Sequence, residues 1–376
     1  MATSSSPLTL RHVLIFHRHG DRTPVVPSIG SNVFEDKDVW AAKVATPEQL
    51  ALLSLTAKPV GADETQAPTI HASRDIDYPY GLLTHQGVEH MIAKGRALRE
   101  RYGSLFIGDV KREDVYVLSS NVPRTIESVQ SLLRGFFYDE AKQQAQDVPE
   151  FLIHTYPRNV LAPQHSLRVF LELERLLYKD ILTLRSEAEQ EATHKLARHV
   201  RACMGIPDDE ALSWTGIRDT LTCRKAHGMP FPEGVDDKIF DQVEAYDTWL
   251  WQRLYHDQAF CHKAFQDGVH ELYTFLKTVR TTKQPAKLSF FSAHDNSVVA
   301  LLAALQIDVG AQLPRYGTML ALELLEDEAT HEFYLQPRYE NEPVTFAGHK
   351  QDLPCPFSLF ESLVLEFLSY KANGPC

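Results

Sequence analysis

The sequence predicts an α/β fold, in which a mixed, mostly parallel sheet is flanked by helices and carries an inserted helical cap. Three short apolar runs, at 13–16, 115–118 and 288–291, have the length and the bounding polar loops of buried strands. Between the second and third runs, the pattern from 167 to about 279 is almost entirely helical. Strands that alternate with helices favour parallel pairing, which gives the fold class.

The helices follow in chain order from apolar spacing and capping residues. The segment 24–80 is rich in Pro, Asp and Thr and predicts long loops with one short helix near 47–55. Thr84 is the expected N-cap of the next helix. The apolar stripe of that helix consists of Val88, Met91, Ile92, Leu98 and Tyr102.

The second and third strand runs each lead through a polar loop into a helix, at 125–137 and 296–305. The chain returns to strands at 319–325 and 332–336. We therefore expect an α/β catalytic core formed by 1–160 and 281–376, with a helical cap inserted at 161–280.

Composition excludes several classes of protein. The net charge of −12 disfavours a general nucleic-acid or anionic-membrane binder, which would need a basic face. No apolar run is long enough to span a bilayer, and no secretory signal is visible, so we expect a cytoplasmic protein, or a secreted or organellar one if a leader is missing. The five cysteines lack CxxC spacing, which indicates free thiols rather than zinc ligands.

The polar loops carry the residues that indicate chemistry. Each loop leaves the carboxyl end of a predicted strand, and parallel strands end at one edge of a sheet, where ligands bind. We therefore expect one crevice to contain Arg18, His19, Arg22, Arg124, His294 and Asp295.

This set of side chains suits a phosphomonoester. Its transition state spreads charge over three oxygens, and the planar, permanently charged guanidinium donates paired hydrogen bonds to such a group. Arg18, Arg22 and Arg124 supply three guanidiniums, and Arg124 adds the field of a helix N-terminus. His294 is a further phosphate donor.

His19 and Asp295 are the expected reacting residues. A neutral imidazole nitrogen of His19 can attack phosphorus, and the covalent intermediate divides one difficult step into two easier ones. Asp295 can protonate the leaving oxygen and can then activate the attacking water as a carboxylate. The first step needs protonated Asp295, which favours an acidic pH unless neighbours raise its pKa.

These residues carry a family resemblance. The segment 18–24 matches the RHGxRxP signature of the histidine acid phosphatase family, and His294-Asp295 matches its HD signature. Further similarity covers 83–87, 119–124 and 219–228. The resemblance implies a phosphoglycerate-mutase-like core with a helical cap, His19 as nucleophile and Asp295 as acid. It also implies that phosphate is held by Arg18, Arg22, Arg124 and His294, without a metal or other cofactor.

Each motif also has a structural interpretation. The 18–24 loop could be a charged surface turn, Arg124 a solvated helix-start arginine, and Asp295 an N-cap. His17 is expected to be structural, and Asp21 to orient an arginine through an ion pair. Pairs of histidines elsewhere lack the spacing of metal ligands and are better explained as solvated helix faces.

The function that we expect is hydrolysis of a phosphomonoester, and two other functions remain open. One is a phosphomutase or phosphotransferase of the same superfamily, which the HD pair disfavours. The other is a non-catalytic binder of phosphate ligands, which the presence of both reacting residues disfavours. The partner is in each case a small phosphomonoester, with phytate, lysophosphatidate and sugar phosphates as candidate substrates.

Overall fold

The computed structural model describes residues 7–68, 70, 78–138, 148–164, 175, 177, 179–283, 285–350 and 353–370, and the structural statements below concern these residues. The predicted start of the long helical stretch, at 167–174, lies outside them, as does Cys376.

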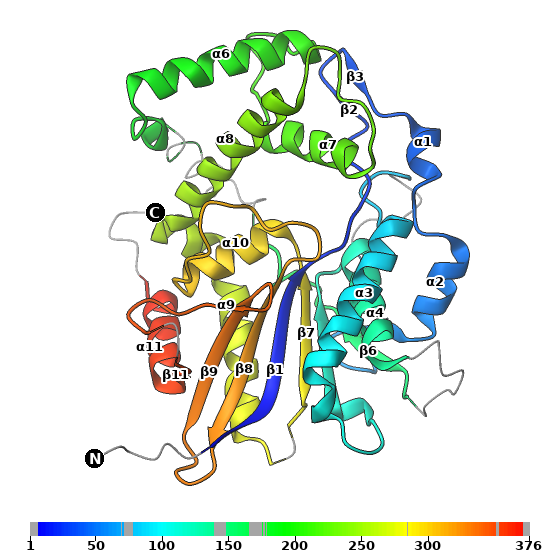
Figure 1. Cartoon of the computed structure of the whole chain (residues 1–376), viewed down its shortest axis with the longest axis vertical. Coiled ribbons are helices and arrows are strands. Elements are labelled where there is room, and N and C mark those ends of the chain that lie inside the picture. Colours follow the sequence, from blue (N-terminus) through cyan, green and yellow to red (C-terminus); the bar gives the residue numbers. More distant parts are fainter. Residues whose placement is uncertain are drawn as a thin grey trace.

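The described residues form a sheet of nine strands with β1 near its middle, in the order β10-β9-β8-β1-β7-β5-β6-β4, and β11 pairs with β9 (Figure 1). The strands from β1 to β4 in that order are parallel, and β8, β9 and β10 are antiparallel to their neighbours. The predicted fold class is confirmed. The bounds are β1 (Leu8–Arg18), β4 (Ala57–Val60), β5 (Val115–Ser119), β6 (Phe151–His154), β7 (Leu288–Ala293), β8 (Met319–Asp327), β9 (Phe333–Tyr339), β10 (Glu342–Pro343) and β11 (Cys355–Pro356).

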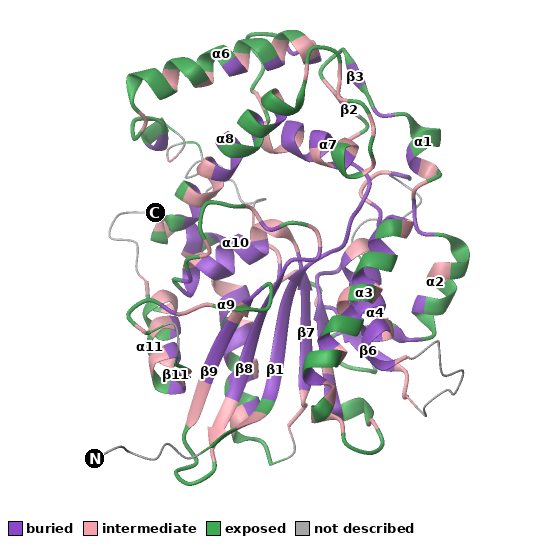
Figure 2. Ribbon diagram, in the orientation of Figure 1, coloured by how far each residue is buried: buried purple, intermediate pink, exposed green. Residues whose placement is uncertain are grey.

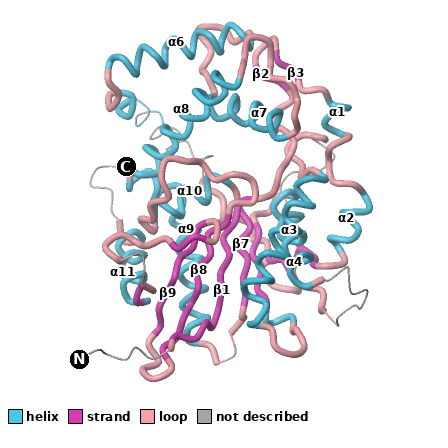
Figure 3. Tube along the Cα trace, viewed as in Figure 1, coloured by secondary structure: helices cyan, strands magenta, loops and turns pink. Residues whose placement is uncertain are grey.

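Helices cover both faces of the sheet, and Figure 3 shows them around the magenta strands. The α-helices are α1 (Lys37–Ala41), α2 (Pro47–Ser54), α3 (His85–Tyr102), α4 (Pro123–Phe137), α6 (Glu187–Met204), α7 (Trp214–Ala226), α8 (Asp237–His256), α9 (Gln258–Thr281), α10 (Asp295–Ala304) and α11 (Phe357–Leu368). There are also two short 3-10 helices, η1 (Gly103–Leu105) and η2 (Arg112–Asp114).

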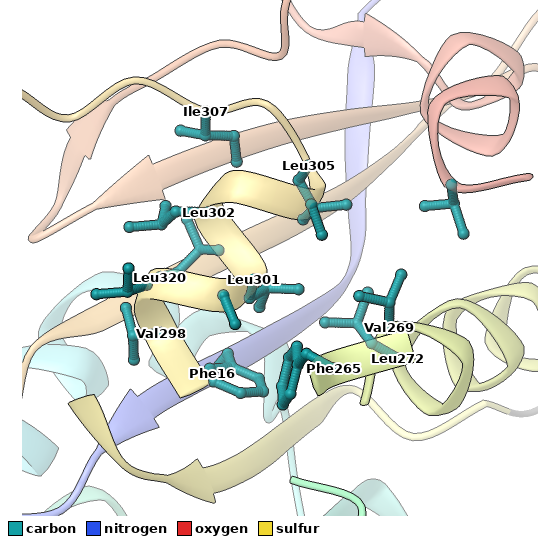
Figure 4. Packing of buried hydrophobic residues seen from close by; sticks show 14 of the residues in the cluster. Phe16, Phe265, Val269, Leu272, Val298, Leu301, Leu302, Leu305, Ile307 and Leu320 are labelled. Atoms are coloured by element: carbon teal, nitrogen blue, oxygen red, sulfur yellow. The ribbon is translucent and has the colours of Figure 1, made fainter. Parts of the chain in front are cut away.

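Strand β1 is buried on both faces, which explains its uninterrupted apolar run (Figure 2). Because side chains alternate along a strand, Val13 and Ile15 join the cluster that contains α3 and α4 side chains. Leu14 and Phe16 join the opposite cluster, formed with α9, α10 and α11, and Figure 4 shows Phe16 beside Phe265.

The registers of the parallel strands place three polar loops at one edge of the sheet. Arg18 at the end of β1 is opposite Ala293 at the end of β7. Ser119 at the end of β5 is opposite Ser292 of β7. The loops that follow β1, β5 and β7 therefore begin side by side.

The helices α6, α7 and α8 lie beyond this edge, at the top of Figure 1, and are called the upper helices below. They share a small apolar cluster of their own with Val33, centred on Val200, Leu221 and Val243. The carboxyl-terminal half of α8 also contributes to the main core through Leu254. The proposed boundaries of the cap, at 161 and 280, stay a prediction.

Two expectations for the first hundred residues can be compared with the structure. Thr84 caps α3 by accepting a hydrogen bond from the Gly87 amide, as its sequence position predicted. The segment 24–80 is less irregular than expected, because it contains the edge strand β4, the pair β2 (Ser28–Ile29) and β3 (Val33–Phe34), and α1. Pro59 lies within β4, which is the outermost strand of the sheet and therefore tolerates a residue without an amide hydrogen. The proline hid this strand from pattern analysis.

Candidate active site

Backbone hydrogen bonds tie the three polar loops together at the sheet edge. The His19 amide donates to the Ala293 carbonyl at 3.0 Å, and the Ser120 amide donates to the Ser292 carbonyl at 2.9 Å. The Arg18 amide donates to the Thr318 carbonyl at 2.9 Å. These bonds fix the backbone beneath the predicted site residues, so that their side chains start from a common, rigid base.

His19 is buried in the centre of the loops, with 2% of its surface exposed. Its Nδ1 lies 2.8 Å from the Gly20 carbonyl oxygen, which assigns the proton to Nδ1 and leaves the Nε2 lone pair free for attack. Burial, followed by the charges of Arg124, Arg18 and Arg22, lowers the pKa of His19 well below its usual range. The imidazole is therefore neutral at moderately acidic pH.

Gly20 serves packing rather than clearance for phosphate. A Cβ at this position would lie 2.8 Å from Cγ of Met91 and 3.1 Å from the Gly87 carbonyl oxygen, both on α3. The Gly20 amide donates to Oγ of Ser128 on α4 at 2.9 Å. The glycine thus lets the loop at 19–24 lie directly against two helices. This loop is called the nucleophile loop below, after the role proposed for His19.

Arg18 is held on two sides and against an aromatic ring. Its Nη1 donates to the Pro314 carbonyl at 2.7 Å, and its Nη2 forms an ion pair with Oδ2 of Asp295 at 2.9 Å. The guanidinium carbon lies 4.4 Å from the centroid of the Tyr316 ring. These contacts fix the plane of the guanidinium beside His19.

Arg22 forms a two-point ion pair with Asp219 of α7. The Arg22 Nη1 and Nη2 atoms lie 3.1 Å and 2.6 Å from the two carboxylate oxygens. Burial alone would lower the pKa of Arg22, but the Asp219 carboxylate outweighs it and raises that pKa well above the usual value. Arg22, which is predicted to bind phosphate, is thus anchored to the upper helices.

Arg124 lies in the first turn of α4, where Pro123 begins the helix. Its Nη1 donates to the Gly81 carbonyl at 3.4 Å. Burial and the charge of Arg22 lower the pKa of Arg124 to about 10, so it remains a cation at neutral pH. Within the described part of the chain, the buried Nε atoms of Arg18, Arg22 and Arg124 all lack a hydrogen-bond partner.

His294 and Asp295 begin α10. His294, not Asp295, is the N-cap residue, which corrects the structural interpretation of Asp295. Nε2 of His294 lies 2.8 Å from Oγ of Ser120, and Asn159 donates to the same hydroxyl at 2.6 Å. Burial and the charge of Arg124 lower the pKa of His294 to about 3, so its ring is neutral in most buffers.

The Asp295 carboxylate is surrounded by donors and cations. Its Oδ1 accepts from the Asn296 amide at 2.9 Å, while its Oδ2 faces Arg18. Burial would raise the pKa of Asp295, but Arg18, Arg218 and Arg22 outweigh burial and hold that pKa below the usual range. Asp295 is therefore ionised while no substrate occupies the site.

The structure brings all six predicted residues together and adds others that the sequence analysis did not assign to the site. Asp219 and Ser120 were noted only as parts of segments similar to the family, while Arg218 and Tyr316 carried no signal of their own. Tyr316 lies between Arg18 and the upper helices, with its hydroxyl 3.2 Å from Sγ of Cys223. Its position depends on a contact between distant parts of the chain.

Two predictions about neighbours of the motif can also be compared with the structure. The expected ion pair of Asp21 with an arginine is wrong, because Oδ1 of Asp21 contacts Thr84 at 2.5 Å and Nε2 of His227 at 2.7 Å. Asp21 thus links the nucleophile loop to α3 and to the end of α7. His17 is buried beside the site, with Nδ1 3.0 Å from the Arg18 carbonyl oxygen, as expected of a structural residue.

The described residues contain no group of three or more His, Cys, Asp and Glu side chains that could hold a metal ion. No helix among them is long and apolar enough to cross a membrane.

The sequence is similar to known proteins over most of its length. The family model for the histidine phosphatase superfamily (branch 2) matches residues 9–340. Lysosomal acid phosphatase of Bos taurus is 26% identical over 365 residues, covering 92% of this chain and 75% of the relative. Prostatic acid phosphatase of Mus musculus is 26% identical over 317 residues, covering 79% and 80%.

Solved structures show the same fold. A phytase from Citrobacter braakii superposes with a TM-score of 0.63 at 13% identity, covering 96% of this chain and 98% of the phytase. The apo form of Hafnia alvei phytase superposes with a TM-score of 0.61 at 15% identity, covering 98% of each chain.

Proposed function

The chain belongs to branch 2 of the histidine phosphatase superfamily, and from that premise we propose how it acts as a phosphomonoester hydrolase of the histidine acid phosphatase type. His19 forms a phosphohistidine intermediate, and Asp295 is the general acid. The observation that carries this proposal is the neutral imidazole of His19, whose free Nε2 is buried among three arginines. The acid phosphatases among the relatives support hydrolysis of phosphate esters.

Phosphate binding falls to Arg18, Arg22, Arg124 and His294. The buried Nε donors that lack partners are available to the non-bridging oxygens. Asp219 offsets Arg22 and the ionised Asp295 offsets Arg18, so Arg124, for which the described residues supply no carboxylate within ion-pair distance, provides most of the uncompensated charge. His294 donates from Nε2 only as the tautomer that carries its proton there. In the free site this proton can point to Oγ of Ser120, and a bound phosphate oxygen can replace Ser120 as the acceptor.

In the first step, Nε2 of His19 forms a bond to phosphorus while the bond from phosphorus to the ester oxygen breaks. The ester oxygen takes a proton from Asp295 and leaves as an alcohol. Nδ1 of His19 keeps its proton and its hydrogen bond to Gly20, which supports the positive charge that develops on the ring. The three arginines stabilise the charge on the equatorial oxygens.

The proton for this step arrives with the substrate. Asp295 is ionised in the free site because of the surrounding guanidiniums. A phosphate ester has a second pKa of about 6, so below that pH it binds as a monoanion that carries one proton. When the phosphate engages Arg18, Asp295 loses part of its cationic surroundings, its pKa rises, and the proton moves to the carboxylate.

In the second step, a water molecule attacks phosphorus and the bond to Nε2 breaks. The Asp295 carboxylate accepts the proton of the water, inorganic phosphate leaves, and His19 returns to its neutral form. The same carboxyl group thus donates in one step and accepts in the next. Its position at the start of α10, beside the nucleophile loop, suits both roles.

A substrate panel tests this function. Wild-type protein is assayed between pH 3 and pH 8 against simple alkyl phosphates, sugar phosphates, phytate and lysophosphatidate, beside a His19→Ala variant. We expect release of inorganic phosphate at acidic pH and a loss of at least about 10³-fold in kcat without His19. Full activity of the variant would contradict the proposal, as would tight phosphate binding without turnover of any ester.

The cytoplasm is the proposed compartment. Its support is that Cys203, Cys223, Cys261 and Cys355 are all free thiols in the structure. A relative named lysosomal acid phosphatase makes an organelle the alternative. Cell fractionation of the native protein separates the two, because enrichment with organelle markers would contradict the cytoplasmic assignment.

A further inference from the structure

A second guanidinium, in addition to Arg18, reaches the general acid from the upper helices. Arg218 on α7 is buried, with 4% of its surface exposed. Its Nη2 lies 3.9 Å from Oδ2 of Asp295, the same oxygen that Arg18 contacts at 2.9 Å. Neither the signature motifs nor the proposed phosphate ligands include this residue.

Neighbouring side chains hold Arg218 in one orientation. Its Nε donates to Oδ2 of Asp247 on α8 at 2.5 Å, and Thr215 donates to the other oxygen of that carboxylate at 2.9 Å. The Trp251 indole donates to the Thr215 hydroxyl at 3.0 Å, and its ring lies 5.3 Å from the Arg218 guanidinium carbon. Arg218 therefore cannot turn toward the phosphate without breaking a buried ion pair.

This fixed orientation separates Arg218 from the phosphate-binding arginines. Arg18 pairs with Asp295 and is also a proposed phosphate-binding residue, so a bound phosphate would compete with the carboxylate for its guanidinium. Arg218 is tied to Asp247 and remains beside Asp295 throughout the reaction. Asp247 also offsets part of its charge, which makes it a poor site for a second anion.

We propose that Arg218 is a positioning residue for the general acid: it keeps a cation against Oδ2 of Asp295 when Arg18 is occupied by phosphate, and so sets the acidity of the proton donor. This inference rests on the proposed function, because it requires Asp295 to be the acid. It also explains why α7 lies over the sheet edge. Asp219 on the same helix pairs with Arg22, so two adjacent residues of α7 act on the site. Asp219 holds a phosphate-binding arginine, and Arg218 contacts Asp295.

Other charged and titratable groups also face Asp295. They come from β1 and its loop, from α4, from the upper helices α7 and α8, and from the start of α10. They are Arg18, Arg22, Arg124, Asp219, Asp247, Arg218 and His294. Asp247 opposes Arg218 in charge. Removal of the Arg218 cation and removal of the Asp247 anion should therefore shift the pKa of Asp295 in opposite directions.

The sign of each shift follows from the charges. Loss of the Arg218 cation makes the Asp295 carboxyl less acidic, so it keeps its proton to a higher pH. The alkaline limb of kcat for an alkyl phosphate, which reports the proton donor in the enzyme–substrate complex, then moves to higher pH. Loss of the Asp247 anion makes Asp295 more acidic, and the limb moves to lower pH.

The test compares Asp247→Asn with the double variant Arg218→Gln and Asp247→Asn, so that neither protein carries an unpaired buried carboxylate at 247. We expect the alkaline limb of the double variant to lie about one pH unit above that of Asp247→Asn. Lys225→Gln, which removes an exposed cation of α7 that pairs with exposed Asp237 instead, is the control and should leave the limb unchanged. Circular dichroism and thermal melting confirm folding of every variant.

The outcomes distinguish this inference from the proposed function. If Asp295 is the acid, Asp295→Asn loses the alkaline limb for the alkyl phosphate. An unchanged limb in Asp295→Asn would overturn the proposed function, and the role of Arg218 with it. Loss of the limb in Asp295→Asn, with no difference between the double variant and Asp247→Asn, would overturn the role of Arg218 alone.

Discussion

Among single residues, the same guanidiniums act on both reacting groups. Arg18 and Arg22 help to lower the pKa of His19, which keeps the proposed nucleophile unprotonated, and they also lower the pKa of Asp295, which removes the proton of the proposed acid. A site built in this way has a ready nucleophile but no stored proton. The protonated form of the ester therefore matters, and acidic pH favours turnover through the substrate rather than through the enzyme's own acid.

The leaving group should decide how much Asp295 contributes. An alkoxide leaves poorly without a proton, whereas a 4-nitrophenolate leaves readily. We expect Asp295→Asn to lower kcat for an alkyl phosphate by about 10²- to 10⁴-fold, and formation of the phosphoenzyme from 4-nitrophenyl phosphate by much less. Rapid-quench measurement of the first turnover checks this, and equal losses for the two esters would contradict a role for Asp295 as acid.

Among elements, close contact between α3 and α4 supports the site from below. Both helices touch the nucleophile loop, through Met91 and Ser128. Gly95 and Gly135 allow that contact, because a Cβ on Gly95 would overlap the Leu132 carbonyl oxygen and one on Gly135 would overlap the Ile92 carbonyl oxygen. The distance between the helices is thus set by two residues without side chains.

This contact yields a stability prediction. Gly95→Ala should force the helices apart and lower the free energy of unfolding by about 1 to 3 kcal/mol. Urea denaturation measures the loss. Gly103→Ala is the matched control at the end of the same helix, where the nearest atom to the new Cβ would be Cγ of Arg99 at 3.5 Å. Equal stability of the two variants would contradict the packing role of Gly95.

The elements differ in how far the sequence predicted them. Strands β1, β5 and β7 and the helices after two of them were predictable because apolar runs, caps and polar loops are local signals. The same locality gave the six site residues, since each lies at the end of a strand or in the segment that follows one. Arg218 and Tyr316 were not predictable, because their roles arise only when α7 and the loop before β8 meet the sheet edge. Asp21 was misassigned for the same reason.

At the scale of the whole molecule, buried histidines make stability depend on pH. His12 is fully buried, with Nδ1 2.7 Å from the Ala286 carbonyl oxygen, and His17 is buried beside the site. Burial lowers the pKa of each to about 4. In the unfolded chain the pKa of histidine is about 6.5, so between these values the unfolded state binds more protons. Stability therefore falls as the pH drops from about 6.5 to 4.

This linkage can be measured directly. The two histidines together should lower the free energy of unfolding by about 3 to 4 kcal/mol between pH 7 and pH 5, as an upper bound. Thermal melts in phosphate-free buffer check the trend, and His12→Asn should reduce the fall by about 2 kcal/mol. His19 and His294, whose pKa values burial also lowers, keep the rest of the trend in place. His194→Asn, at an exposed position, should leave the pH dependence unchanged. An unaltered pH dependence in His12→Asn would count against this account.

The central claim, a covalent phosphohistidine on His19, is tested most directly by trapping the intermediate. The Asp295→Asn variant is mixed with radiolabelled 4-nitrophenyl phosphate and quenched in alkali within milliseconds, and its peptides are examined by mass spectrometry. The account predicts label that is stable in alkali and lost in acid, on the peptide that contains His19. Label on another residue, or a complete turnover with no labelled peptide, would contradict it.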